Sequence, residues 1–196
     1  MRVINRFLIV AALSLGLAGC GVNDIPTFEE QAKANWAQVQ NQYQRRADLI
    51  PNLVETVKGY AAQERETLEA VVKARAEATQ TTLPPEMLTD PAAFQKFQQA
   101  QGQLGSALSR LMVVVERYPD LKSAENFRML QTQLEGTENR IAVARRDYIE
   151  AVRLYNTELV TFPGRLWAMI LYTDKQQMQT FTAAPTATET PRVNFN

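Results

Sequence analysis

Few side chains in this sequence could build an active site. The chain contains no histidine, which removes the commonest general base near neutral pH and the commonest metal ligand. The serines Ser106, Ser109 and Ser123 fall within or at the caps of predicted helices, and no nucleophile elbow or phosphate-binding glycine loop is present. The reactive group that stands out is therefore the thiol of Cys20, the single cysteine.

Carboxylates are the remaining groups that could carry out acid or base catalysis. Glu64 and Glu138 form a conceivable pair, although acidic residues on long helices are usually solvated or paired with arginine. Without histidine or a second cysteine, neither a zinc site nor a bundle-type metal site is expected. The sequence thus predicts a protein that is not an enzyme and has no catalytic residues, no metal and no cofactor.

The residues before Cys20 have the layout of a signal peptide. Arg2 and Arg6 precede an uncharged apolar segment, residues 7–19. A helix needs roughly 20 apolar residues to cross a bilayer, so a permanent transmembrane helix is the weaker interpretation of this shorter segment.

Residues 17–20, Leu-Ala-Gly-Cys, resemble the lipobox of bacterial lipoproteins. This resemblance implies that the sulfur of Cys20 is joined to diacylglycerol and that the chain is then cleaved before Cys20. The alternative is that Cys20 is a small residue near an ordinary cleavage site. Lipid on Cys20 would anchor the chain stably, since each buried methylene contributes about 0.8 kcal/mol, and it would leave no free thiol.

The sequence divides into four parts. We expect a signal peptide at residues 1–19, a tether at 20–26, a helical domain at 27–181, and a disordered tail rich in Thr, Ala and Pro at 182–196. Loss of Arg2 and Arg6 would leave 19 basic against 21 acidic side chains, a net charge of −2. This balance does not indicate a nucleic-acid-binding surface.

The first part of the domain has the apolar periodicity of a helix. The pattern T-x-x-E from Thr27 to Glu30 predicts a capping box, and apolar residues follow at steps of three and four as far as Ala78. Pro51 interrupts this stretch. A kink is favoured because the apolar stripe passes Pro51 in register, but a complete break there would make two helices.

Two more long helices are expected after the proline-containing loop at residues 79–90. Asp90 and Pro91 predict an N-cap for the first of them, which Pro119 ends. Asp120 or Ser123 is expected to cap the next, the longest apolar stripe in the sequence.

The predicted fold class is all-α, an antiparallel up-and-down bundle of long helices. It has three long helices if the first is kinked at Pro51, or four if it breaks there, and a short C-terminal helix. Gly136, inside the last long helix, suggests a close approach of helices. Residues 165–171 (RLWAMIL) predict the short helix, covering one end of the bundle; the alternative is a membrane-inserting wedge.

Several polar residues interrupt the apolar seams of the predicted helices. A role in fixing register and pairing is expected first, provided that each finds a partner when buried; a polar groove or partner surface is the alternative. These residues are Arg46, Glu64, Arg75, Gln101 and either Thr137 or Glu138.

Two blocks of sequence resemble the LemA family. They are RRADLIPNLVETVKGYAAQER at residues 45–65 and YPDLKSAENFRMLQTQLEGTENRIAVARRDYIEAVRLYNTELVTFPG at residues 118–164, and the likeness extends over about 28–172. It implies a helical bundle at a bacterial membrane, facing outside the cytoplasm, and supplies no catalytic residues. The chain departs from typical members by a lipobox in place of an uncleaved transmembrane helix, by Gln63 in place of histidine and by Ile149 in place of asparagine.

The leading functional hypothesis is a lipid-anchored, non-catalytic envelope scaffold or adaptor with an unidentified protein partner. The runner-up is a bundle that binds a small ligand or peptide, motivated by aromatic seam residues: Trp36, Tyr43, Tyr148 and Tyr155. Gly21 follows Cys20 where an aspartate would resemble an inner-membrane retention signal. The outer membrane is therefore favoured in a cell that has both membranes.

Overall fold

The computed structural model describes residues 21–182. The predictions made for the signal peptide, for Cys20 and for the tail beyond residue 182 lie outside these residues.

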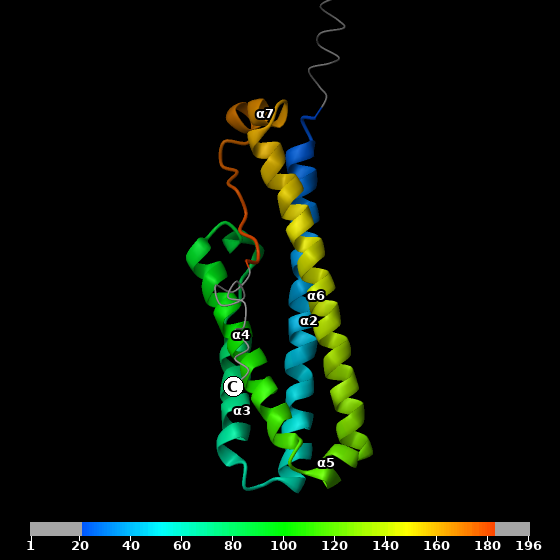
Figure 1. Ribbon diagram of the computed structural model, residues 1–196. Helices are drawn as coiled ribbons and strands as arrows, with labels where there is room; N and C mark the ends of the chain where they lie inside the picture. Colours follow the sequence, from blue (N-terminus) through cyan, green and yellow to red (C-terminus); the bar gives the residue numbers. More distant parts are fainter. Residues whose placement is uncertain (1–20, 183–196) are drawn as a thin grey trace, which may run out of the picture.

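Four long helices dominate the described chain, and it contains no strand (Figure 1). The all-α bundle predicted from the sequence is confirmed. The long helices are α2 (Asp24–Tyr60), α3 (Arg65–Gln80), α4 (Pro91–Val115) and α6 (Glu125–Val160). Three short ones complete the fold: η1 (Pro85–Met87), α5 (Pro119–Ser123) and α7 (Gly164–Ile170).

The bundle is a rod built from two unequal helix pairs. Helices α2 and α6 pack along each other over most of their length (Figure 1). Each of the two helices is about 55 Å long at 1.5 Å per residue. Helices α3 and α4 pair beside the lower part of α2 and α6, whereas α7 lies at the opposite end of the rod. Helices α4 and α6 approach each other closely at few points.

The chain reverses its direction after α2, at residues 61–64. This turn lies ten residues beyond Pro51, where the sequence predicts a kink or a break. Helix α2 continues through Pro51, whose ring is exposed, so that the lost backbone hydrogen bond is on the solvent side. At Ala61 the backbone leaves the helical conformation (φ −135°), and its side chain is buried. The stretch expected to form one helix up to Ala78 is therefore two antiparallel helices.

The structure confirms one of the three helix N-caps that the sequence predicts. The Asp90 carboxylate accepts hydrogen bonds from the N–H groups of Ala92 (2.8 Å) and Ala93 (3.2 Å), which confirms the predicted cap of α4. The capping box at Thr27 is wrong, because α2 already begins at Asp24, inside the segment predicted as a tether.

The cap predicted for the last long helix is also wrong. Helix α6 starts after Ala124, which has no side-chain cap, and the Ser123 hydroxyl instead donates to the carbonyl of Asp120. The close helix approach suggested by Gly136 is wrong too, since a Cβ atom at this glycine would meet nothing within 4 Å. The short helix predicted at residues 165–171 is confirmed as α7.

The core consists of two apolar clusters, one toward each end of the rod. The cluster nearer α7 is centred on aromatic rings, among them Trp36 and Tyr148, and the other on aliphatic residues such as Leu53 and Leu111. Among residues 21–182, no helix combines the length and the apolar character needed to cross a membrane.

Candidate functional site

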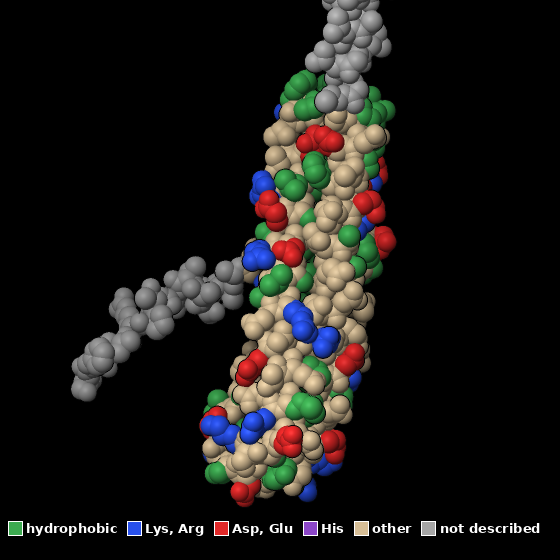
Figure 2. Space-filling model, turned by 90° about the vertical axis from the view of Figure 1, so that its right-hand side faces the viewer, with side chains coloured by type: hydrophobic (Ala, Val, Ile, Leu, Met, Phe, Trp, Pro, Cys, Tyr) green, Lys and Arg blue, Asp and Glu red, His purple; other side chains and the backbone are tan. Residues whose placement is uncertain are grey.

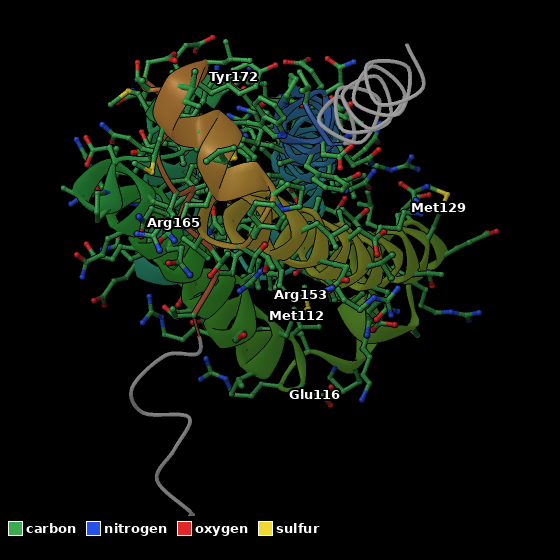
Figure 3. All side chains as sticks on the ribbon, turned by 90° about the horizontal axis from the view of Figure 1, so that it is seen from above. Met112, Glu116, Met129, Arg153, Arg165 and Tyr172 are labelled. Atoms are coloured by element: carbon green, nitrogen blue, oxygen red, sulfur yellow. The ribbon has the colours of Figure 1, made fainter. Side chains whose placement is uncertain are left out.

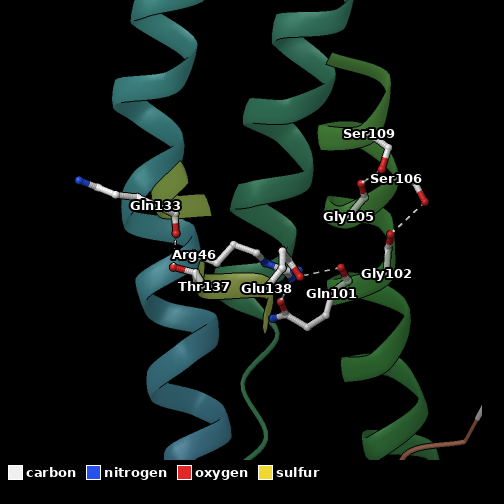
Figure 4. Close-up of polar contacts among 9 residues, drawn as sticks. All are labelled: Arg46, Gln101, Gly102, Gly105, Ser106, Ser109, Gln133, Thr137 and Glu138. Carbon is white, nitrogen blue, oxygen red and sulfur yellow. Dashed lines mark hydrogen bonds and ion pairs between the residues drawn. The ribbon is translucent and has the colours of Figure 1, made fainter. Parts of the chain in front are cut away.

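A buried arginine, Arg46 of α2, lies between the two apolar clusters (Figure 4). Its Nη1 donates to Oε1 of Glu138 on α6 at 3.0 Å. Its Nη2 donates to Oε1 of Gln101 on α4 at 2.6 Å and to the Gln101 carbonyl at 3.3 Å. One side chain thus bonds two neighbouring helices at the same level of the rod.

Gln101 extends this network to the remaining long helix. Its Nε2 donates to the carbonyl of Ala78 on α3 at 3.1 Å. Thr137 is fully buried at the same level, but its hydroxyl donates to the Gln133 carbonyl within α6. We call Arg46, Gln101 and Glu138 the polar layer, because together they join α2, α3, α4 and α6.

The two ends of the ion pair differ sharply in exposure. The Arg46 side chain is 5% exposed and that of Glu138 is 46% exposed. The Nε of Arg46 is buried and has no partner among the described residues. A buried charge must be compensated by hydrogen bonds, and α4 and α6 supply acceptors for Arg46 through Gln101 and Glu138.

An open groove runs between α4 and α6 on both sides of the polar layer. Its two parts, of about 590 and 600 Å³, share Gly105 and Glu138. The first part has a mixed lining, in which the polar side chains Arg46, Arg145, Gln95, Gln98 and Gln99 lie beside the apolar side chains of Ile141 and Phe181. The second mixes apolar and polar side chains: Leu108, Ser109, Met112, Gln131, Leu134, Glu135 and Asn139.

Two glycines of α4 face this groove. Gly102 and Gly105 line it, and a Cβ atom added at either would meet no other atom within 4 Å. A glycine inside a helix costs about 1 kcal/mol relative to alanine, and neither position is too crowded for an alanine.

Three of the four aromatic seam residues, Trp36, Tyr148 and Tyr155, lie in the core, whereas Tyr43 also lines the first part of the groove. Trp36 packs against Tyr148 and Phe97 with ring centroids 5.1 and 5.2 Å apart, and its Nε1 donates to the Leu83 carbonyl. Burial raises the pKa of Tyr155 to about 12 and raises the pKa of Tyr148 as well, so both hydroxyls stay neutral at ordinary pH.

The remaining predicted seam residues have structural partners away from the groove. Glu64 lies in the turn after α2, where it accepts hydrogen bonds from the Tyr118 hydroxyl (2.7 Å) and from Arg117 (3.0 Å). The conceivable catalytic pair of Glu64 with Glu138 is therefore not formed. Arg75 of α3 donates through Nε to the Ala47 carbonyl of α2 at 2.8 Å.

Two pairs of residues escape sequence reasoning because the segment after α7 returns along the bundle. The Arg145 guanidinium lies 4.3 Å from the centre of the Phe181 ring at the groove edge. Glu29, nearly buried, pairs with Lys175 at 2.8 Å. Burial alone would raise the pKa of Glu29, but hydrogen bonds from Lys175 and Lys33 lower it overall.

The described residues contain no group of three or more side chains that could hold a metal ion. The groups that converge in the polar layer are bonded to one another across the helices. Fold and site together define an all-α bundle protein with a polar layer and a lateral groove. The chain belongs to the LemA family, whose sequence model matches residues 35–195.

Curated relatives are found in two magnetic bacteria. Magnetosome proteins MamQ 1 and MamQ 2 of Paramagnetospirillum magneticum are each 30% identical to the chain over 164 residues, which is 76% of the chain. Magnetosome protein MamQ of Magnetospirillum gryphiswaldense is 29% identical over the same length. The chain spans about 60% of the length of these relatives.

Proposed function

We propose that the protein is a lipid-anchored, non-catalytic scaffold or adaptor of the bacterial envelope, and that it holds a protein partner in the groove between α4 and α6. The observation that carries this proposal is the groove itself, which opens along the side of the rod on both sides of the polar layer. The relatives are named as magnetosome proteins and not after a reaction, which supports a role without catalysis.

The lining of the groove suits a polypeptide segment. Gln95, Gln98 and Gln99 offer amide donors and acceptors that can pair with a partner's backbone. Leu108 and Met112 add apolar surface farther along α4. A mixture of apolar area and amide groups is what a bound peptide needs, because its backbone must keep its hydrogen bonds when it leaves water.

The anchor is the second part of the proposal. We propose that lipid on Cys20 holds the chain at the membrane after cleavage of residues 1–19, with the outer membrane favoured where a cell has both. The test is the intact mass of the membrane-extracted protein beside that of a Cys20→Ala variant. An unmodified cysteine in the native protein would contradict this anchor.

Site-specific photo-crosslinking in living cells tests the groove. A photoreactive residue at Gln99, Ser109 or Asn139 lines the groove and is exposed, whereas one at Lys73 on α3 lies outside it. We expect one discrete protein adduct from the three groove positions and none from Lys73. No adduct from the groove positions, or the same adducts from Lys73, would contradict the scaffold hypothesis.

Gly105 provides a matched pair of variants. Gly105→Ala adds one methyl group to open space, whereas Gly105→Trp fills the groove where its two parts meet. We expect the crosslinked adduct to persist in Gly105→Ala and to disappear in Gly105→Trp, with both proteins folded by circular dichroism.

The same groove also favours the second candidate, a bundle that binds a small ligand or peptide, since each part has the volume of a ligand site. Native mass spectrometry of the membrane-extracted protein distinguishes the two. A bound mass released by Gly105→Trp and not by Gly105→Ala would favour the ligand-binding function, particularly if crosslinking captured no protein.

A further inference from the structure

The end of the rod that carries α7 exposes a cluster of large apolar side chains. Among the described residues, 13 large hydrophobic side chains are exposed, and six of them fall within residues 160–171. The others are scattered singly over the bundle, which is ordinary for a soluble surface, but a contiguous group marks an interaction site. We call this group the apolar tip: Val160, Phe162, Leu166, Met169, Ile170 and Leu171.

Helix α7 lacks the polar outer face of a surface helix. Leu166, Met169 and Ile170 are spaced i, i+3 and i+4, so they share one face, and all three are exposed. Trp167 and Ala168 pack against the apolar core on the other side. A helix that covers a core normally presents charged residues to water, so this outer face is built for an apolar neighbour.

The N-terminal segment enters the bundle at this same end. Tyr172, directly after the tip, donates from its hydroxyl to the Val22 carbonyl at 3.1 Å. Gly21 lies against the turn before α7, since a Cβ built on it would be 3.2 Å from Cγ of Pro163. In Figure 1 the blue start of α2 lies beside the orange helix α7, and Figure 2 shows green side chains gathered at this end.

The tip itself carries a single charge, although two acidic side chains lie beside it: Glu158 is next to Gly164, and Asp24 is close to Glu158 and Gly21. Arg165 is the only charged residue within residues 160–172, and it is exposed. Figure 3, seen from above, shows α7 lying across the end of the bundle between Arg165 and Tyr172. A cation beside exposed apolar side chains can meet lipid phosphates, at about 1 kcal/mol per basic residue near an anionic surface.

We propose that the apolar tip inserts into the interface of the lipid bilayer, so that the rod stands on the membrane with α7 as its foot. The occupant of the tip is the bilayer, because the apolar segment 7–19 and Cys20 lead directly into Gly21 at this end. Lipid on Cys20 and a membrane-embedded segment 7–19 would both bring the bilayer here, so the inference does not depend on acylation.

This orientation sets the distances from the membrane to the other parts of the rod. Along α6, Met129 lies 31 residues before Val160, a distance of about 47 Å at 1.5 Å per residue. Interfacial helices bury their apolar face only about 5–10 Å into a bilayer, so the groove and the far end remain in water.

Depth-dependent quenching on the full-length protein tests this inference. The chain is placed in vesicles of phosphatidylethanolamine and phosphatidylglycerol, with an environment-sensitive fluorophore on an introduced cysteine in Phe162→Cys or Met169→Cys. Met129→Cys, an exposed site at the far end, is the control, and the unsubstituted chain gives the background from Cys20. We expect quencher-labelled lipid to roughly halve the emission of the tip probes and to leave the Met129 probe unchanged.

Two outcomes would overturn the inference. Tip probes that emit and respond like the Met129 probe would show that the tip faces water. Blue-shifted emission that quencher-labelled lipid does not affect would show that a second copy of the chain covers the tip instead.

A double substitution of Met169 and Ile170 by Asp provides a further check. It should abolish quenching of the Phe162 probe while the chain stays bound to the vesicles. Persistent quenching would count against insertion. These fluorescence measurements do not depend on the photo-crosslinking experiment, so a failure to capture a protein partner in the groove would leave this inference standing.

Discussion

Arg46 on α2 and Gln101 on α4 are joined by a hydrogen bond of 2.6 Å in the middle of the bundle. Each is almost completely buried, and each also reaches another helix, Arg46 through Glu138 of α6 and Gln101 through the Ala78 carbonyl of α3. Arg46 and Gln101 therefore link the four long helices to one another between the two apolar clusters.

The two ends of the polar layer should contribute very differently to stability. We expect Arg46→Ala to lower the free energy of unfolding by about 2–4 kcal/mol, because it empties a buried site and leaves Gln101 without its donor. Glu138→Gln should cost less than about 1 kcal/mol, because Glu138 is half exposed and retains water. Urea unfolding followed by circular dichroism measures both. If both substitutions lowered the free energy of unfolding by the same amount, the polar layer would be acting as an ordinary surface ion pair.

Much of this layer is predictable from the sequence, because a polar residue on an apolar stripe is visible in the spacing alone. Arg46 and Gln101 were expected at the seams and are buried there, and of the two alternatives on the last long helix, Thr137 is buried and Glu138 is half exposed. The turn at residues 61–64 was not predicted, because the apolar stripe continues through it in phase and no proline marks it.

The C-terminal segment could not be placed from the sequence for a different reason. Residues 172–182 have no helical periodicity, and their position is set by contacts with residues far away in the chain. The Tyr148 hydroxyl donates to the Gln179 carbonyl at 2.8 Å, and Asn156 exchanges hydrogen bonds with the backbone of Met178. Such long-range pairing leaves no local signal, so Phe181 and Arg145 were missed as parts of the groove edge.

Two glycines should respond in opposite directions to the same substitution. Gly136→Ala should raise the free energy of unfolding by about 0.5–1 kcal/mol, because the new methyl group meets nothing and alanine is the better helix former. Gly164→Ala should lower it, because the new Cβ would collide with the carbonyl and the side chain of Glu158. Chemical unfolding of the detergent-solubilised protein tests both, and stabilisation by both substitutions would contradict the packing described for α7.

Glu158 should make stability fall as the pH rises. Burial, together with the nearby charge of Asp24, raises the pKa of Glu158 above its ordinary value of 4.5, and its Oε1 is buried without a partner among the described residues. Folding therefore favours the protonated form: the stability is fully present below pH 4.5 and is lost as the pH rises through the raised pKa. Glu158→Gln should be more stable than the unsubstituted protein at pH 7 and should lose this advantage at pH 4. An advantage that is independent of pH would assign the effect to packing and not to ionisation.

Phe181 should decide whether the C-terminal segment stays on the bundle. Its ring packs against Phe94 and Tyr148 with centroids 5.2 and 5.8 Å apart, and Arg145 covers it. Phe181→Ala should lower the free energy of unfolding by about 3 kcal/mol, because removal of a buried aromatic ring leaves a cavity. Phe181→Leu, which keeps most of the apolar volume, should lose much less. Hydrogen exchange of residues 172–182 measures the local effect and should accelerate in Phe181→Ala more than in α2. Uniform acceleration throughout the bundle would mean that the segment is an inseparable part of one core and not a strap laid along it.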